Sequence, residues 1–525
     1  MSTRNALITA ALGLTLALGA CTAPRFDAVP QPESLAWAHP AQTALAQAFA
    51  PPPGAASGAL PLVAGQDAFA ARVVLVDRAQ HTLDLQYYIV RDDATTRLLM
   101  ARVLAAAQRG VRVRLLVDDL DALGKDLDLG TLAAAGPVQV RLFNPFATRG
   151  RFGPGHLLEL LADSRRLNRR MHNKLWVADN AVAVVGGRNL GDEYFDASEG
   201  INFADLDLLL AGSAVPAVSA SFDAYWNSPW AVPIQALRRG APPDAAEQGD
   251  FEAALAAQEQ RFRASAYAVA LPDGRLTQAL RAGRVELQPA QAEVFHDPPS
   301  KVDPALDGQR APQPLARRLQ PLLAGARAEV LLVTPYLIPS AQGLQVLEQL
   351  ARRGVRVRVL TNSLASAEML PVAHAGYSRH RAALARAGVE LHEMRPGPHE
   401  PWRWRSPARW SGGSLHTKAF VIDRQHVLVG SMNLDPRSRD ANTEIALLLD
   451  SPALGRTLGA LFDEAVDPTR AWQVRWVAPD GDVPHLRWQA REGGLPLQTA
   501  HEPEAGLWRR ALARLLRAIA PEALL

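Results

Sequence analysis

The sequence contains a single cysteine, Cys21, among its 525 residues. One cysteine can form no disulfide within the chain and cannot supply the cysteine cluster of a structural zinc site. Lysine is almost as scarce, although lysine and arginine together number 56. The sequence has only four lysines, at Lys125, Lys174, Lys301 and Lys418. Since arginine serves wherever a general positive charge suffices, each remaining lysine is a candidate for a position that needs a compact ammonium group.

The sequence also lacks a strong excess of charge of either sign. Its formal net charge is +3 at pH 7, from 56 basic and 53 acidic side chains. A nucleic-acid-binding protein would show a strong basic patch or stripe, so we expect no nucleic-acid partner, whereas this balance is compatible with anionic lipid. A chain of 525 residues, 48% of them hydrophobic, is expected to form two or three domains.

No apolar run is long enough to span a bilayer comfortably, and the longest one predicts a secretion signal. The apolar stretch over residues 6–18 follows Arg4 and precedes Leu-Gly-Ala-Cys, which resembles the bacterial lipobox. We expect residues 1–20 to be a signal peptide and Cys21 to be acylated. An ordinary signal peptide and an uncleaved anchor are the alternatives. The predicted location is at a membrane, lipid-anchored and facing the periplasm of a Gram-negative-type bacterium.

An internal duplication organises the rest of the chain. RGVRVRLLVDD (109–119) matches RGVRVRVLTNS (353–363), and the segment 171–189 matches 415–433, both at a spacing of 244 residues. Two separate segments with one spacing indicate a repeat. In each copy a strand, a helix and a second strand follow one another, which predicts a parallel βαβ unit.

The repeat predicts an α/β fold of two similar α/β/α lobes. A stretch rich in proline, alanine and glycine before the first lobe reads as a flexible tether. The expected divisions are a tether at 21–65, a first lobe at 66–235, a connection at 236–289, a second lobe at 290–470 and a C-terminal extension at 471–525.

Both copies contain the pattern His-x-Lys-x4-Asp, followed by two small residues and an asparagine. The candidate site residues are His172, Lys174, Asp179, Gly187 and Asn189 in the first copy, and His416, Lys418, Asp423, Ser431 and Asn433 in the second. Histidine and lysine two residues apart on a strand share one face, and a hairpin would return the asparagine to that face. We expect the substrate-binding residues to be Gly187, Asn189, Ser431 and Asn433. Imidazole can attack phosphorus or carry a proton, while ammonium and amide groups donate to phosphate oxygens. We therefore expect both copies to surround one phosphate, without a metal or another cofactor.

Carboxyl groups complete the predicted site. Asp179 and Asp423 belong to the catalytic motif, but each opens a turn, and we expect them to organise the hairpins rather than touch phosphate. Each histidine needs an orienting partner on its second ring nitrogen. The best candidates are carboxyl groups on the next apolar strand of each lobe, where burial without such a role is hard to explain. We expect Asp205 to lie near His172 and Glu444 near His416.

At these residues the chain resembles the phospholipase D superfamily, whose hallmark is a pair of HKD motifs. Segments such as RLFNPF (141–146), VVGGRNLGDEYF (184–195) and TNSLAS (361–366) resemble the C-type cardiolipin synthases. The resemblance implies two lobes related by a pseudo-twofold axis, with one active site between them, so that a monomer suffices. It also implies transfer of a phosphatidyl group, from phosphatidylglycerol or phosphatidylethanolamine to phosphatidylglycerol, through a phosphatidyl-histidine.

The same resemblance assigns roles to individual residues. It implies His172 as the nucleophile and His416 as general acid and then base, with the lysines and the asparagines Asn189 and Asn433 holding the phosphate. A phosphodiester hydrolase, a nuclease and an inactive lipid-binding lipoprotein are the alternatives. The intact motifs disfavour the last, and the modest charge disfavours the nuclease.

Two further segments suggest contact with a membrane. The loop PWRWRSPARW (401–410) interleaves tryptophan and arginine, as interfacial segments do. The tail LWRRALARLLRAI (507–519) predicts a basic amphipathic helix, which either lies on lipid or packs its apolar face on the second lobe. The residues of its apolar face are Trp508, Ala511, Leu512, Leu515, Leu516 and Ile519.

Overall fold

The computed structural model describes residues 32–519, apart from 123–125, 151, 238–242, 272–273, 307–313, 368–370, 397–412 and 479–483. The predicted signal peptide, the predicted lipidation site Cys21 and the Trp–Arg loop at 401–410 lie outside the described residues. Within the described part of the chain, none of the helices combines the length and the apolar character that crossing a bilayer requires.

The first lobe is built on a mixed sheet that is buried on both faces. Its strands, in order across the sheet, are β9 (Ala231–Pro233), β4 (Val138–Phe143), β3 (Arg112–Asp118), β2 (Thr82–Tyr87), β5 (Leu175–Ala178), β6 (Val182–Gly186), β8 (Asp207–Gly212) and β1 (Ser57–Leu62). The strands β4, β3 and β2 are parallel, and the other pairings are antiparallel. The predicted βαβ unit is present, with a helix over 94–108 between β2 and β3.

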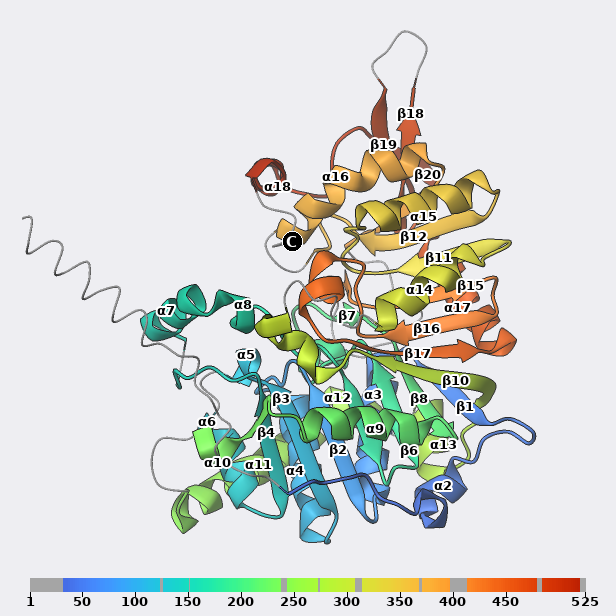
Figure 1. The fold of residues 1–525 in the computed structure, drawn as a ribbon. Helices are drawn as coiled ribbons and strands as arrows, with labels where there is room; N and C mark the ends of the chain where they lie inside the picture. Colours follow the sequence, from blue (N-terminus) through green and yellow to red (C-terminus); the bar gives the residue numbers. More distant parts are fainter. Residues whose placement is uncertain are drawn as a thin grey trace, which may run out of the picture.

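Helices cover this sheet on both sides (Figure 1). On the outer face lie α3 (Gly65–Arg78), α4 (Ala94–Gln108) and α6 (Asp126–Ala134), together with α11 (Ala245–Arg263), α12 (Ala266–Ala270) and α13 (Arg275–Ala282) from the predicted connection. The inner face is covered by α9 (Val215–Trp226). The connection is therefore part of the first lobe's helical layer, because residues such as Leu255 and Leu280 join its core.

The second lobe repeats the same arrangement. Its strands, in order across the sheet, are β10 (Gln288–His296), β17 (Ile445–Asp450), β16 (His426–Gly430), β15 (Ala419–Ile422), β11 (Glu329–Val333), β12 (Arg356–Asn362), β13 (Glu390–Met394), β18 (Ala471–Val477), β19 (His485–Glu492) and β20 (Leu495–Thr499). Its outer helices are α14 (Pro314–Ala324), α15 (Ala341–Arg352) and α16 (Val372–Arg386), and α17 (Pro452–Ala465) covers the inner face. A pair of βαβ units is thus confirmed, since β11 and β12 are also parallel.

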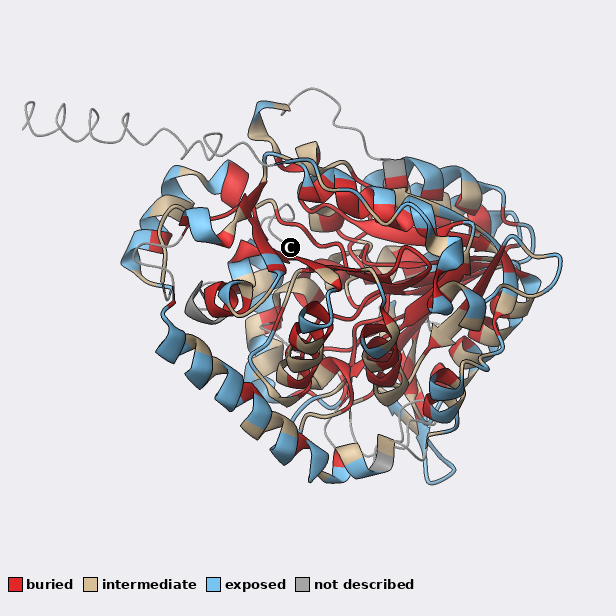
Figure 2. Cartoon of the chain, turned by 90° about the horizontal axis from the view of Figure 1, so that it is seen from below, coloured by how far each residue is buried: buried red, intermediate tan, exposed pale blue. Residues whose placement is uncertain are grey.

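The lobes join edge to edge. β1 pairs antiparallel with β10, so that the two sheets form one run of eighteen strands. An antiparallel pairing of equivalent edge strands is what a twofold relation between the lobes requires. The inner faces share a single hydrophobic core, in which Phe222 and Trp226 of α9 belong with Leu454 and Leu458 of α17. Figure 2 shows the strands almost wholly buried, with the exposed residues gathered on the outer helices.

The predicted tether at 21–65 is wrong for its described part. β1 is an integral strand between β8 and β10, and the chain before it is held to the first lobe, where Trp37 stacks on His81 at 4.1 Å between ring centroids. The Ser34 carbonyl oxygen accepts a hydrogen bond from the buried Arg114. Glycine and proline made this stretch read as a linker. However, β10 pairs only with residues 57–59 of β1, so Pro61 has a neighbouring strand on one side alone, where proline is tolerated.

The C-terminal extension continues the second lobe. The strands β18 to β20 lengthen its sheet, and the predicted helix forms over the expected residues as α18 (Leu507–Ile519), packed on α16. Its orientation was not expected. Arg509 and Ala513 face the lobe, while Trp508, Leu515 and Ile519 are 79%, 55% and 63% exposed.

Candidate active site

Each motif histidine is positioned by the lobe that does not carry it. The segment that ends at His172 forms a bridge with Thr443, and the His172 amide donates to the Thr443 carbonyl oxygen at 2.9 Å. In the second copy, β14 (Ser414–Leu415) pairs with β7 (Phe203–Ala204) of the first lobe, and the His416 amide donates to the Ala204 oxygen at 2.8 Å. Segments of the two lobes therefore pair with each other across the interface (Figure 1), and both lobes are needed to form the site.

The carboxyl partners are also exchanged, which corrects the predicted pairing. His172 Nδ1 lies 3.0 Å from Glu444 Oε2, and His416 Nδ1 lies 2.6 Å from Asp205 Oδ2. Both carboxyl groups are partners of histidine as expected, but each serves the histidine of the other lobe. With Nδ1 engaged in each ring, Nε2 is the nitrogen left to face a substrate.

The two lysines lie fully inside the site. Each is 1% exposed, and each ammonium donates to the carbonyl oxygen of its own histidine, at 2.7 Å from Lys174 Nζ to His172 O. Burial lowers the pKa of Lys174 to about 7, although Glu444 opposes that shift. A bound anion would stabilise both buried ammonium groups.

Burial lowers the pKa of both imidazoles. His172 and His416 are 7% and 8% exposed. Burial, reinforced by the charges of Lys174 and Lys418, lowers the pKa of His172 well below 6.5. The same causes lower the pKa of His416 to about 4, against the opposing effect of Asp205. Both rings are therefore neutral near pH 7 in the free protein, and a phosphate anion between the lysines would raise both pKa values.

The two carboxyl groups differ in their own pKa. Burial alone would raise the pKa of Asp205, but the hydrogen-bonded His416 and the charge of Lys418 outweigh it and bring that pKa to about 2. Burial raises the pKa of Glu444, although Lys174 opposes the rise. Asp205 is therefore firmly ionised, whereas Glu444 holds its charge more weakly.

The small residues Gly187 and Ser431 do not lie where substrate binding was expected. A Cβ atom on Gly187 would come within 2.1 Å of Asp205 Oδ1, so this position must be glycine for the carboxylate to reach His416. The Ser431 hydroxyl donates to Glu444 Oε2 and accepts from the Ile445 amide. Both residues therefore support the carboxyl groups beneath the histidines.

The motif aspartates hold the hairpins, as expected. Asp179 accepts hydrogen bonds from three successive amides at 80–82, and Asp423 accepts from those at 327–329. Both have positive φ, at 53° and 51°, and open the tight turns β5–β6 and β15–β16. Asp179 lies five residues from Lys174 along a strand, roughly 16 Å at the rise of extended chain, so it acts on the site through the position of β5.

The two asparagines differ in their surroundings. Asn189 Nδ2 donates to the Tyr194 hydroxyl at 2.9 Å, and its Oδ1 accepts from the Ile89 amide at 3.2 Å. Asn433 is 5% exposed, and its buried Oδ1 has no hydrogen-bond partner. In the free protein, the Asn189 side chain is therefore hydrogen-bonded, whereas the side-chain oxygen of Asn433 is an acceptor without a donor.

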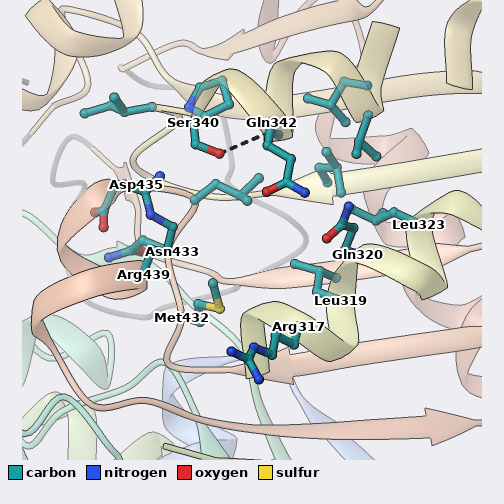
Figure 3. Close-up of a pocket in the computed structure, with 17 residues that line it drawn as sticks. Arg317, Leu319, Gln320, Leu323, Ser340, Gln342, Met432, Asn433, Asp435 and Arg439 are labelled. Atoms are coloured by element: carbon teal, nitrogen blue, oxygen red, sulfur yellow. Dashed lines mark hydrogen bonds between the residues drawn. The ribbon is translucent and has the colours of Figure 1, made fainter. Parts of the chain in front are cut away.

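A cavity of about 580 Å³ adjoins Asn433 (Figure 3). It lies between α14, α15 and the loop after β16, and its apolar wall includes Leu319, Leu323 and Met432. Polar side chains at its edge include Arg317, Gln320 and Gln342. Cavities of this size, mostly apolar with a few polar groups, are typical of small-molecule sites.

Sequence reasoning missed a buried network behind Glu444. Lys301 Nζ donates to Asp297 Oδ2 at 2.7 Å and to the Ser438 carbonyl oxygen at 3.0 Å. Asp297 Oδ2 in turn accepts from the Glu444 amide, and the Ser438 hydroxyl donates to Glu444 Oε1. The scarcity of lysine was the signal that could have found Lys301, because only four lysines are present and three of them lie at this site.

Aromatic rings enclose the histidines. Tyr88 lies edge-on to His172 at 5.1 Å, and Phe203 and Tyr194 lie 5.4 and 5.3 Å from His416. Such walls keep water away from a reacting phosphate and strengthen the electrostatic contacts within the site.

Known proteins share the duplicated domain of this chain. The family model described as "Cardiolipin synthase, PLD-like domain" matches residues 73–226 and again 319–466. The chain belongs to this family of phospholipase D-like proteins. It is 36% identical to cardiolipin synthase C of Escherichia coli K12, over 89% of this chain and 96% of that protein. It is 24% identical to cardiolipin synthase A of Cronobacter sakazakii, over 79% of this chain and 71% of that protein.

A solved structure supports the fold. The chain is similar to the crystal structure of phosphatidylserine synthase from Haemophilus influenzae Rd KW20, with a TM-score of 0.52 and 12% identity. The match covers 79% of this chain and 87% of the synthase chain. The expected phospholipase D-like α/β fold with two copies of the domain is thereby confirmed. The protein is an enzyme, a phosphatidyltransferase of the phospholipase D superfamily, and its substrates are phospholipids.

Proposed function

We propose that this phosphatidyltransferase makes cardiolipin, by moving a phosphatidyl group from one phospholipid to the headgroup hydroxyl of phosphatidylglycerol. One observation carries the proposal: two neutral histidines, each oriented through Nδ1 by a carboxyl group of the other lobe, meet in one buried site with two ammonium groups. This arrangement suits double displacement at a phosphodiester. The relationship to the cardiolipin synthases supports the choice of substrates.

In the first step, His172 Nε2 attacks phosphorus and forms a phosphatidyl-histidine. The strongly lowered pKa of His172 keeps its ring unprotonated, as a nucleophile must be. The phosphate bound between the lysines raises the pKa of His416, which takes up a proton from water. His416 then gives this proton to the oxygen of the leaving glycerol, so that the P–O bond breaks without releasing an alkoxide. The hydrogen bond of His416 to the ionised Asp205 stabilises the imidazolium from which that proton comes.

In the second step, the roles reverse at His416. Its neutral ring takes the proton from the acceptor hydroxyl, the hydroxyl oxygen attacks phosphorus, and the bond to His172 breaks. Lys174 and Lys418 face the charge that develops on the phosphate oxygens in both steps. The free acceptor of Asn433 suits the hydroxyl of an acceptor headgroup, and the adjoining cavity offers room for that lipid.

Product analysis tests this function. Purified protein is incubated with phosphatidylglycerol alone and with added phosphatidylethanolamine, and the lipid products are identified by mass spectrometry. Cardiolipin and free glycerol are expected from phosphatidylglycerol alone if it serves as donor, whereas dependence on phosphatidylethanolamine would identify the other donor. Phosphatidic acid as the sole product would show a hydrolase instead. EDTA is expected to leave turnover unchanged, and a loss that a divalent ion restores would contradict the proposed mechanism.

We also propose that Cys21 is acylated and anchors the enzyme on the periplasmic side of a membrane, a proposal that rests on its lipobox-like context. Metabolic labelling with a fatty acid is expected to mark the wild type but not Cys21→Ala. Label that persists in Cys21→Ala would exclude Cys21 as the acylated residue.

A further inference from the structure

Two helices, one from each lobe, expose apolar faces that no described part of the protein covers. On α7 (Pro154–Ala162), Leu157, Leu158 and Leu161 are 53%, 67% and 73% exposed, and the preceding Phe152 is 58% exposed. The opposite side of α7 faces the lobe, where Glu159 accepts hydrogen bonds from the amides at 147 and 148. The outward side of α7 thus carries large apolar groups in succession, which surface helices ordinarily turn inward.

The second helix is α18, which contacts the lobe through Ala513 and through arginine hydrogen bonds. The Arg509 side chain donates to the Ala367 carbonyl oxygen, and Arg379 of α16 donates to the Arg517 oxygen at 2.7 Å. The side left outside carries Leu507 and Trp508, 83% and 79% exposed, with Leu515 and Ile519 one and two turns further on. An apolar strip that remains exposed while the helix is firmly attached indicates an interaction surface.

Both helices are attached at the edge of their sheet where the histidines lie. α7 follows β4, and the short helix α8 (Ser164–Leu167) after it leads directly into the segment that ends at His172. α18 packs on the loop after β12, where Leu364 contacts Ala513, and Asn362 of that strand binds Leu415 beside His416. Figure 1 shows α7 and α18 on the same side of the molecule.

We propose that the outward faces of α7 and α18, together called the docking face, insert into the surface of a lipid bilayer and place the mouth of the active site on it. The choice of a bilayer rests on the proposed function, because the substrates are lipids. Charge supports it as well. The exposed sides carry no acidic residue, and Arg165 of α8 and Arg514 of α18 are exposed, as suits anionic headgroups.

A local probe tests this surface independently of any N-terminal anchor. Because Cys21 is the only cysteine, a Cys21→Ala background accepts a single new cysteine for an environment-sensitive fluorophore. The test positions are Leu158→Cys and Leu515→Cys. The controls are Val269→Cys on α12 and Leu495→Cys on β20, which are apolar and 66% and 71% exposed. Vesicles contain phosphatidylglycerol with phosphatidylcholine, or phosphatidylcholine alone.

With anionic vesicles, the fluorophores at 158 and 515 are expected to shift to the blue and to become protected from an aqueous quencher, while those at 269 and 495 do not. Equal behaviour at all four positions would overturn the proposal. Protection at 158 and 515 that grows with protein concentration in the absence of lipid would show a second copy of the chain on the docking face, and would overturn it as well.

Charged substitutions link docking to turnover. Leu158→Asp with Leu161→Asp, or Leu515→Asp with Ile519→Asp, is expected to weaken vesicle binding of the Cys21→Ala protein by about tenfold or more. Turnover on vesicles should fall, while turnover on short-chain phosphatidylglycerol below its critical micelle concentration stays unchanged, which also shows that the variants are folded. If the wild type transfers no phosphatidyl group from either lipid form, the proposed function fails, whereas the fluorophore shifts still decide the docking face.

Discussion

The two copies of the motif, called half-sites, have similar backbone structures and differ in the carboxyl group that holds each histidine. His416 has a short hydrogen bond to Asp205, whose pKa is lowered to about 2. His172 has a longer one to Glu444, whose pKa is raised by burial and which also accepts from two serine hydroxyls. The duplicated motifs thus supply two similar imidazoles, but the carboxyl groups that bind them differ in pKa. A firmly ionised partner suits the ring that must carry a proton, and a weakly charged partner suits the nucleophile.

The largest effect is expected from loss of either histidine. His172→Asn and His416→Asn should each lower steady-state turnover by on the order of 10⁴ or more, because the two rings act as a unit. Turnover is measured by cardiolipin formation, with vesicle binding as the control for folding. A variant that keeps a tenth of the wild-type rate would show that its histidine takes no part in catalysis.

Substitution of the two carboxyl groups should lower turnover to different extents. Asp205→Asn is expected to lower turnover by about 10²–10⁴, because the amide cannot stabilise protonated His416. Glu444→Gln should cost clearly less, since the amide oxygen can still accept one of the two serine hydrogen bonds. Both rates are measured at saturating lipid. An equal or larger loss for Glu444→Gln would remove the electrostatic difference on which the assignment of roles rests.

The lysines should be equivalent to each other but not replaceable by arginine. Lys174→Arg is expected to lower turnover by about 10²–10³, nearly as much as Lys174→Ala, because a planar guanidinium does not fit the buried space of an ammonium. The measurement is kcat for both variants, and Lys418→Arg should behave alike. Wild-type turnover in Lys174→Arg would contradict the account of a tight site.

The smallest effect concerns stability against pH. The folded pKa of His416 is about 4, below the ordinary 6.5, so the unfolded chain binds a proton between these values that the folded chain does not. Stability should therefore fall as pH drops from about 6.5 to about 4, by up to about 3 kcal/mol for this group. Denaturant unfolding at pH 7 and pH 4.5 measures it. His416→Asn should lose less stability than the wild type over this interval, and an equal loss would show that His416 does not contribute.

Much of the fold followed from patterns that are local in sequence. The spacing of 244 residues predicted the two lobes, and strand–helix–strand periodicity predicted β2, α4 and β3. Turn chemistry predicted the place of Asp179. In contrast, β1 was missed because glycine and proline weaken the signal of a strand whose stability comes from two neighbours in the sheet.

The remaining errors concern tertiary contacts, between the lobes or within one of them. Glu444 and Asp205 were identified as partners, but their exchange depends on segments that cross the pseudo-twofold axis, and periodicity within a lobe carries no trace of it. Ser431 was assigned to substrate because it occupies a motif position, yet its hydroxyl is bound to Glu444. The outward turn of α18 depends on arginine contacts with α16 and its preceding loop, which an amphipathic pattern alone does not specify.

The central claim is that the two histidines have different roles, with His172 forming the bond to phosphorus. Trapping the intermediate tests it most directly. In His416→Asn the base of the second step is missing, so a phosphatidyl adduct should accumulate, and mass spectrometry of the acid-sensitive linkage after a mild quench should place it on His172. An adduct on His416 in His172→Asn, with none on His172 in His416→Asn, would contradict the assignment.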